Sequence, residues 1–289
     1  DLNKRTRSRS GIDPLVTTPK NPQPFFLYFC QFAVHSPFQA KQEDIQHFAG
    51  KKTRGWNGHS NPTYAGMVKA MDDCVGTVME TLKSTGQADN TVIVFMSDNG
   101  GCAENVDGRN FNDKNVPIGA KGSYVTYDYP WANVSNTPFR KYKKFMHEGG
   151  MITPCIIQWP AKIKAKPGFN EGVGHIIDLL PTSLELAGVP INNLPGQSLS
   201  YLWNGKAMQP ETYFWEHVGN KAMRKGNWKI VKDIEDADWE LYDMSTDITE
   251  SNNLSKTNTA LLNQMIAEYE LWTKNNGVKV FVKGKNKAD

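Results

Sequence analysis

The stretch TVIVFMSDNGG, residues 91–101, decides the fold because it joins a strand pattern to a polar end. Residues 91–96 are apolar or β-branched, which is typical of a strand buried on both faces of a sheet. Asp98, Asn99 and Gly100 then follow, separated from the strand only by Ser97. These residue types also form ordinary turns, so this stretch alone leaves open whether Asp98 and Asn99 carry chemistry.

Two earlier segments complete a strand, helix and strand in alternation. Residues 24–34, PFFLYFCQFAV, are a continuous apolar run that predicts another buried strand, and residues 61–86 predict a helix. This alternation indicates a parallel α/β sheet, in which ligands collect beyond the carboxyl ends of the strands. His35 directly follows the first predicted strand, so we expect it at the same edge as Asp98 and Asn99.

The predicted helix over residues 61–86 has an apolar stripe and clear end signals. Asn61 is the expected N-cap, Pro62 suits the first turn and Gly86 suits the exit. The stripe follows a three-four spacing, so we expect it to be buried; its members are Tyr64, Met67, Val68, Met71, Val75, Val78, Met79 and Leu82.

The later part of the chain changes to antiparallel character. Residues 153–160 predict a buried strand, and residues 178–188 predict a short helix with Asp178 as its cap. Short, aromatic-rich, partly alternating segments after about residue 190 predict an antiparallel sheet, and an amphipathic helix is expected over about 257–275.

We therefore predict a mixed, mostly parallel α/β sheet flanked by helices, with a smaller antiparallel α+β subdomain. The predicted parts are a disordered or linker terminus (1–23), the later part of an α/β domain (24–189) and the subdomain (190–280).

Composition narrows the classes of partner. The 289 residues carry a net charge of +3, which gives no case for a nucleic-acid partner. No stretch approaches the roughly 20 apolar residues of a membrane span, so we expect none. The four cysteines, Cys30, Cys74, Cys102 and Cys155, have no metal-type spacing.

Six blocks in series resemble the later part of a type I, formylglycine-dependent sulfatase of the arylsulfatase kind, in the alkaline-phosphatase-like superfamily. The resemblance runs from about Pro24 to Leu254. The blocks are PFFLYFCQFAVHSPFQA, SDNGG, SNTPFRKYKKFMHEGGMITPCIIQWP, HIIDLLPTSLELAGV, WEHVGNKAMRKGNWKIV and LYDMSTDITESNNL.

The resemblance implies roles for four residues. Asp98 and Asn99 would ligate a divalent cation, usually Ca²⁺, for which carboxylate and amide oxygens are suitable hard ligands. His35 would contact the sulfate and donate a proton to the leaving alcohol. Lys143 would clamp the sulfate and the leaving oxygen, a favourable use of fixed positive charge. Lys144 is the rival assignment, because glycines of the family pattern are replaced around this lysine.

Other residues receive weaker interpretations. His217, Asn220 and Arg224 are candidate substrate-binding residues contributed by the subdomain. We interpret the sequence Glu148-Gly149-Gly150 as a structural turn. Four more residues are left open between substrate contact and a supporting or surface role: Lys121, Arg140, His147 and His175.

The nucleophile of the family is absent from this sequence. It is a cysteine, or a serine in its place, in the pattern C-x-P-S-R, oxidised to formylglycine, and none of the four cysteines here fits that pattern. The early Asp-Asp pair that completes the family's metal site is also absent after any early strand. We therefore expect this chain alone to be inactive. Its missing N-terminal segment is an expected partner for open sheet edges.

The leading function is a sulfuric ester hydrolase that removes sulfate from a sulfated sugar or an aryl ester, with Ca²⁺ as cofactor. One alternative is a catalytically inactive module that binds sulfate or glycan, or that pairs with another subunit. A second alternative is a related phosphoester hydrolase. By resemblance alone, we expect a periplasmic or secreted location.

Overall fold

The computed structural model describes residues 23–51, 61–104, 112–126, 128–164, 169–170, 172–204, 211–236 and 238–281. It divides into two compact units. The first comprises Asp1–Val94, Asn105–Thr126 and Ile157–Ala161, and the second comprises Phe95–Glu104, Tyr127–Ile156 and Lys162–Asp289. The predicted disordered terminus falls outside the described residues, except for Gln23. The domain boundary near residue 190 stays a prediction.

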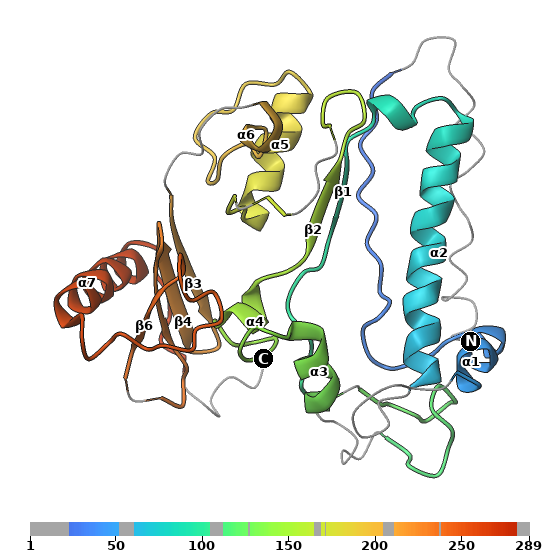
Figure 1. Cartoon of the computed structure of the whole chain (residues 1–289), viewed down its shortest axis with the longest axis horizontal. Helices are drawn as coiled ribbons and strands as arrows, with labels where there is room; N and C mark the ends of the chain where they lie inside the picture. Colours follow the sequence, from blue (N-terminus) through green and yellow to red (C-terminus); the bar gives the residue numbers. More distant parts are fainter. Residues whose placement is uncertain are drawn as a thin grey trace. The chain divides into compact units, whose positions relative to one another are not determined.

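Two helices dominate the first unit. Helix α1 spans Gln42–Ala49 and packs against α2, which spans Pro62–Ser84 (Figure 1). The predicted cap is confirmed, because the Asn61 side chain accepts a hydrogen bond from the backbone of Tyr64 at 2.9 Å. A 3-10 turn, η3, follows at Ala88–Asn90.

The apolar stripe of α2 is only partly buried. Met67 and Leu82 are buried, whereas Val68 is 38% exposed and the remaining members of the stripe are half-buried. The prediction of a fully buried stripe was therefore wrong, because spacing identifies a helix face and not what covers it.

The predicted strand at residues 24–34 is also wrong. This segment has no regular secondary structure, and it carries large exposed side chains such as Phe26 and Tyr28, which are 78% and 81% exposed. An apolar composition is compatible with a strand, but a strand exists only where a neighbouring backbone supplies hydrogen-bond partners. Among the described residues, no strand pairs with this segment.

Strands β1 (Ile93–Met96) and β2 (Cys155–Gln158) confirm two of the predicted strands. They pair in a two-stranded sheet and run side by side in Figure 1. Within the described part of the chain, these two strands represent the predicted α/β sheet. The loop after β1 carries Asp98, and β2 follows the short helix α4, which spans Glu148–Met151.

Short helices occupy the middle of the second unit: α3 at Asp128–Asn136, η4 at Ile176–Asp178, α5 at Leu179–Leu186 and α6 at Tyr201–Asn204. Helix α5 confirms the predicted helix, but Asp178 does not cap it with its side chain. That buried carboxylate instead accepts hydrogen bonds from the backbone amides of His175 and Gln197, at 2.7 and 2.9 Å. Asp178 therefore organises the chain before the helix.

The antiparallel sheet predicted for the later part of the chain is confirmed. It has four strands in sequential order: β3 (Thr212–His217), β4 (Asn220–Lys225), β5 (Trp228–Lys232) and β6 (Glu240–Asp243). The β3–β4 hairpin turns through Val218 and Gly219, both at positive φ (47° and 90°), as the right-handed twist of a two-residue hairpin requires.

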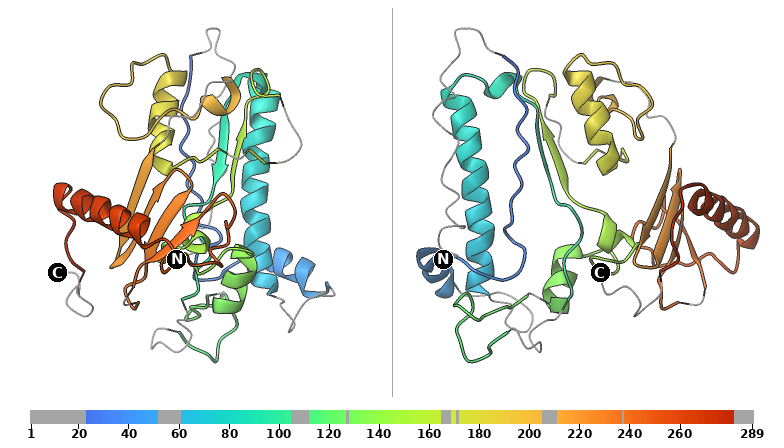
Figure 2. Two further views of the ribbon diagram at one scale, coloured as in Figure 1. Left: turned by 60° about the vertical axis from the view of Figure 1, so that its left-hand side comes forward. Right: turned by 180° about the vertical axis from the view of Figure 1, so that it is seen from behind.

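The two faces of this sheet differ in chemistry. One face packs on α7, which spans Thr259–Asn275 and confirms the predicted final helix (Figure 2). This apolar core contains Met223, Ile230, Leu241, Met265 and Tyr269. The neighbouring residues in each strand point to the opposite face, because side chains alternate along a strand. That second face contacts Met146, in the segment just before α4.

None of the described helices is both long and apolar enough to cross a membrane.

Candidate functional site

The DNGG loop, residues 98–101, leaves β1 with its polar side chains accessible. Asp98 is exposed and Asn99 is half-buried. The side-chain nitrogen of Asn99 donates to the carbonyl of Gly100 at 2.8 Å, which orients the amide and leaves its oxygen as the atom suited to ligation. The loop thus presents a carboxylate and an amide oxygen at the end of a strand, as the sequence predicts.

The lysine segment, residues 140–150, is joined to the DNGG loop by backbone hydrogen bonds. The amide of Lys143 donates to the carbonyl of Gly101 at 2.9 Å, and the amide of Gly100 donates to the carbonyl of Gly150 at 3.1 Å. All of these residues belong to the second unit. The structure therefore brings together the predicted metal-binding loop and the predicted sulfate-binding lysine.

Glycines make this backbone contact possible. A Cβ atom on Gly100 would lie only 1.8 Å from the carbonyl oxygen of Gly149. A Cβ on Gly149 would lie 2.2 Å from the carbonyl oxygen of Arg140, and one on Gly150 would lie 2.1 Å from that of Phe145. The interpretation of Gly149 and Gly150 as structural residues is supported, because no side chain fits in these places.

A buried asparagine, which the sequence gave no reason to select, joins the same two segments. The side-chain oxygen of Asn136 accepts from the amide of Gly101 at 2.8 Å, and its nitrogen donates to the carbonyl of Lys141 at 3.0 Å. Asn136 is the last residue of α3. An amide at the end of a helix also suits an ordinary turn, so its pattern carries no signal of this role.

Lys143 and its rival Lys144 have different surroundings. Lys144 is exposed and forms an ion pair with Glu104. The hydrogen bond from Lys144 is the main cause that lowers the pKa of Glu104, and a smaller electrostatic contribution comes from Lys143. Lys143 is half-buried, and its charge also opposes the rise in the pKa of Cys102 that burial causes. The ammonium group of Lys143 therefore lies near Cys102 and Glu104, in the residues that follow the DNGG loop.

His35 is exposed in the first unit. Its Nδ1 lies 2.8 Å from the carbonyl oxygen of Ser36, to which it can donate a hydrogen bond. This contact fixes the proton on Nδ1 and leaves Nε2 as the atom that can take up and deliver a proton. Asp98, Asn99 and Lys143 belong to the second unit, so the placing of His35 beside them stays a prediction.

The three predicted substrate-binding residues have different surroundings. Asn220 is buried, and its side chain donates to the carbonyl of Lys144 at 3.1 Å and accepts from the amide of Ile234 at 2.9 Å. His217 is exposed and pairs with Asn220 across the hairpin. Arg224 lies four residues further along β4, about 13 Å from Asn220 at the usual rise per residue. The structure thus places Asn220 in direct contact with the lysine segment, His217 opposite Asn220 in the hairpin, and Arg224 opposite Lys229 in β5.

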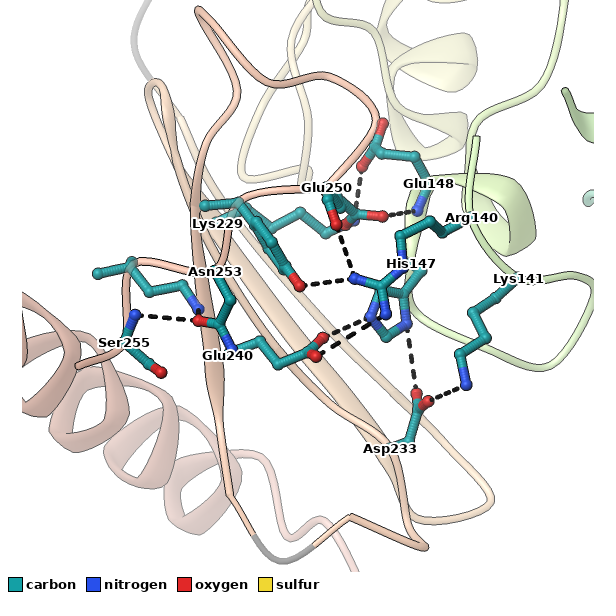
Figure 3. Close-up of polar contacts among 12 residues, drawn as sticks. Arg140, Lys141, His147, Glu148, Lys229, Asp233, Glu240, Glu250, Asn253 and Ser255 are labelled. Carbon is teal, nitrogen blue, oxygen red and sulfur yellow. Dashed lines mark hydrogen bonds and ion pairs between the residues drawn. The ribbon is translucent and has the colours of Figure 1, made fainter. Parts of the chain in front are cut away.

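The lysine segment is held against the polar face of the β3–β6 sheet by a cluster of eight charged side chains (Figure 3). We call it the charge cluster, and its members are Arg140, Lys141, His147, Glu148, Lys229, Asp233, Glu240 and Glu250. Three of them are permanent cations near neutral pH and four are carboxylates, so the cluster is electrically balanced when His147 is protonated.

The surroundings of His147 favour its protonated form. The ring is only 1% exposed; its Nε2 lies 2.6 Å from Glu240, and its Nδ1 lies 3.4 Å from Asp233. A neutral imidazole would direct a lone pair at one of these carboxylates. Burial by itself lowers the pKa of His147, but the two carboxylates outweigh burial and the pKa is raised above its usual value. The pKa values of Asp233 and Glu240 are lowered, because their contacts with His147 outweigh burial.

The sequence analysis left Arg140 and His147 undecided and did not single out Lys229, Asp233, Glu240 or Glu250. A signal is nevertheless present in the strand pattern. Lys229 alternates with the core residue Ile230 in β5 and shares its face with buried Val231. A lysine on an inward-facing strand position needs a buried carboxylate partner, and this requirement could have been recognised.

Asp98 and Asn99 fit a Ca²⁺ site by donor chemistry but do not complete one. Calcium takes six to eight oxygen ligands, and this pair supplies a carboxylate and an amide oxygen. Across the described residues, no group of three or more His, Cys, Asp or Glu side chains is placed to hold a metal ion. The two residues therefore fit as part of a ligand set.

Family models match most of the chain. One described as Sulfatase matches residues 10–189, and one described as N-sulphoglucosamine sulphohydrolase, C-terminal, matches residues 139–274.

Curated relatives are sulfatases. An uncharacterized sulfatase of Schizosaccharomyces pombe is 29% identical over 92% of this chain and 60% of its own length. The arylsulfatase of Klebsiella aerogenes is 30% identical over 62% of this chain and 49% of its own length. The N-acetylgalactosamine-6-sulfatase of Mus musculus is 28% identical over 87% of this chain and 42% of its own length. The chain thus spans about half the length of the curated relatives it matches.

Solved structures with a similar fold match most of the chain. The crystal structure of Ps i-CgsB is 33% identical, with a TM-score of 0.61, over 83% of this chain and 48% of that one. A structure from a Bacteroides thetaiotaomicron locus for glycosaminoglycan metabolism is 22% identical, with a TM-score of 0.54, over 75% of this chain and 45% of that one, and it supports the fold alone. The predicted family and its alkaline-phosphatase-like α/β fold are confirmed.

The protonated state of His147 predicts a pH-dependent stability. Because the pKa of His147 is raised in the folded chain, its contribution is fully present below its unfolded value of about 6.5 and is lost as pH rises through the folded value. We expect the free energy of unfolding, measured by urea denaturation from about pH 6 upward, to fall by up to about 1.4 kcal/mol per pH unit in that window. His147→Gln removes this slope.

The matched control is His217→Gln, which changes an exposed histidine of the same unit. It should keep the slope of the parent chain. A slope that persists in His147→Gln would show that another group titrates in this window.

Proposed function

The chain belongs to the sulfatase family, and from this premise we propose that it forms the cation- and sulfate-binding part of a sulfuric ester hydrolase. The observation that carries the proposal is the direct bonding of the DNGG loop to the lysine segment. The amide of Lys143 donates to the carbonyl of Gly101. The carboxylate of Asp98 and the ammonium of Lys143 are therefore carried by two backbone segments that are hydrogen-bonded to each other.

Lys143 would stabilise the negative charge that develops during the reaction. Cleavage of a sulfate ester develops negative charge on the leaving oxygen, and a fixed ammonium group beside that oxygen stabilises it. His35 complements this role, because its Nε2 can deliver a proton to the same leaving oxygen while Nδ1 is held by Ser36. Protonation turns a poor leaving group into a neutral alcohol.

Asp98 and Asn99 would hold Ca²⁺ through their side-chain oxygens. The bound ion would supply positive charge at the sulfate oxygens, in addition to that of Lys143. The exposed carboxylate of Asp98 suits a ligand to a cation that further residues of the complete protein also contact.

The substrate is proposed to be a sulfated sugar or an aryl sulfate. Relatives named N-acetylgalactosamine-6-sulfatase and arylsulfatase support these two classes. His217 is the residue of the β3–β6 sheet best placed to select among them, because it is exposed and pairs with Asn220, which contacts the lysine segment. We propose a periplasmic or secreted location by analogy with the family.

The nucleophile must come from a segment that this sequence does not contain. We expect the coding DNA upstream of Asp1, read in frame, to encode an Asp-Asp pair and the pattern C-x-P-S-R or its serine form. The chain alone is then expected to give no turnover of an aryl sulfate, and the complete protein is expected to hydrolyse it. A start codon directly before Asp1, together with sulfate binding but no turnover, would instead favour the binding-module alternative.

The choice of lysine is tested by two neighbouring substitutions in the complete protein. Lys143→Ala is expected to lower kcat for an aryl sulfate by roughly 10²–10³-fold, the usual effect of removing one group that stabilises developing charge. Lys144→Ala removes only an exposed ion pair with Glu104 and is expected to change kcat little. The reverse order of effects would assign the clamp to Lys144.

The proton-donor role of His35 is tested by leaving-group dependence. His35→Ala should lower turnover by roughly 10²–10⁴-fold for an alkyl or sugar sulfate, whose leaving group needs a proton. The loss should be much smaller for a nitrophenyl sulfate, whose leaving group departs as an anion. An equal loss for both substrates would contradict proton donation and point to a binding role.

A further inference from the structure

Glu250 is tied to both ends of the lysine segment. Its backbone carbonyl accepts a hydrogen bond from the guanidinium of Arg140 at 2.6 Å. Its side-chain Oε2 accepts from the backbone amide of Glu148 at 2.7 Å. Lys143 lies between these two anchored points, so one residue of the loop after β6 fixes the start and the end of the segment that carries it.

Lys229 holds the carboxylate of Glu250 in place. Its ammonium group is completely buried, 2.7 Å from Oε1 of Glu250 and 2.6 Å from Oε1 of Glu148 (Figure 3). Oε1 of Glu250 is therefore engaged by Lys229 while Oε2 faces the amide of Glu148. The carboxylate has little freedom to turn away from the lysine segment.

The backbone of Glu250 is in an unusual conformation. Its φ angle is +56°, in the left-handed region that residues other than glycine rarely adopt, and the residue is fully buried. Such a conformation persists only where the surrounding contacts determine it. The turn around Asp247, whose carbonyl accepts from the amide of Glu250 at 3.2 Å, supplies some of these contacts. The bonds to Arg140, Glu148 and Lys229 supply the others, and they link the strained residue to the lysine segment.

Stability alone is a weak reason for this arrangement. Buried ion pairs often contribute no more to stability than well-packed apolar side chains of similar size, because desolvation offsets the attraction. Hydrogen bonds to a buried carboxylate do, however, impose a defined geometry on their donors. Geometry matters most for a segment whose lysine must meet a reacting oxygen.

We propose that Glu250 is a positioning residue that sets the place of Lys143 by fixing both ends of the lysine segment. The inference rests on the proposed function only where it takes Lys143 to be the sulfate clamp. Its structural part concerns the backbone of residues 98–101 and 140–150 and can be tested without any assay of activity.

Two substitutions separate the charge of Glu250 from its reach. Glu250→Asp keeps the negative charge for Lys229 but shortens the side chain by one methylene, so the carboxylate withdraws from the amide of Glu148. Glu250→Gln keeps the length but removes the charge. The aspartate variant keeps a negative charge near the ammonium of Lys229 and suits the left-handed backbone better than glutamate does, so it is the variant expected to fold.

Amide hydrogen exchange in the chain as it stands gives the first measurement. In Glu250→Asp, protection of the amides of Gly100, Gly101 and Lys143 is expected to fall by roughly tenfold or more, because a charge-assisted bond that fixes the lysine segment is lost. The amide of Met244, which donates to the carbonyl of Asn227 just beyond the end of the β5–β6 pair, should keep its protection.

The matched control is Glu268→Asp, which shortens a glutamate paired with Lys225 on the surface of the same unit. It should leave all of these amides unchanged. Unchanged protection at Lys143 in Glu250→Asp, with a loss only in Glu250→Gln, would overturn the proposal in favour of simple charge balance. An equal loss at Met244 would overturn it in favour of general stability.

Kinetics of the complete protein give the second measurement. Glu250→Asp is expected to lower kcat by roughly 10–100-fold with a smaller change in KM, because misplacing Lys143 weakens its contact with the transition state more than its contact with the bound substrate. An intact kcat would overturn the link to Lys143. If the unsubstituted complete protein hydrolyses no sulfate ester, the proposed function fails, while the exchange measurement still decides whether Glu250 positions the segment.

Discussion

The contact between the DNGG loop and the lysine segment is the constraint on which the site depends. The amide of Gly100 bonds to the carbonyl of Gly150, and no side chain fits between Gly100 and the carbonyl of Gly149. Two backbones meet here without intervening side chains, which leaves few degrees of freedom between them. The place of Lys143 relative to the loop is therefore set by main-chain hydrogen bonds, and the side chains around it determine how firmly it is held.

Local patterns predicted the elements that local chemistry determines. The cap at Asn61, the strand at residues 91–96 and the alternating strands after residue 211 were correct, because capping, burial and period-two spacing act over a few residues. The expectation that Asp98 and Lys143 belong to one site came from family resemblance instead. The backbone hydrogen bonds between the DNGG loop and the lysine segment now give this expectation a physical basis.

The failures of the sequence analysis share one physical cause. Each concerns a structural feature that depends on a partner distant in the chain. Residues 24–34 have the composition of a strand but no hydrogen-bonded neighbour among the described residues, and the apolar side chain of Val68 is exposed. Glu250 and Asn136 look like ordinary loop or helix-end residues, and their roles appear only when the segments that they contact are present. No periodicity encodes such contacts.

The two faces of the β3–β6 sheet differ in polarity. The face that meets the lysine segment is the more polar of the two. The face against α7 is apolar, and an apolar contact is non-directional, so small shifts of the helix cost little there. The opposite face packs a small apolar cluster against Met146 and surrounds it with charged groups that have fixed bonding directions, although apolar contacts of similar size would be no less stable. Directional contacts resist sliding, and the backbone that they hold carries Lys143. The sheet is therefore better regarded as part of the site than as an appended domain.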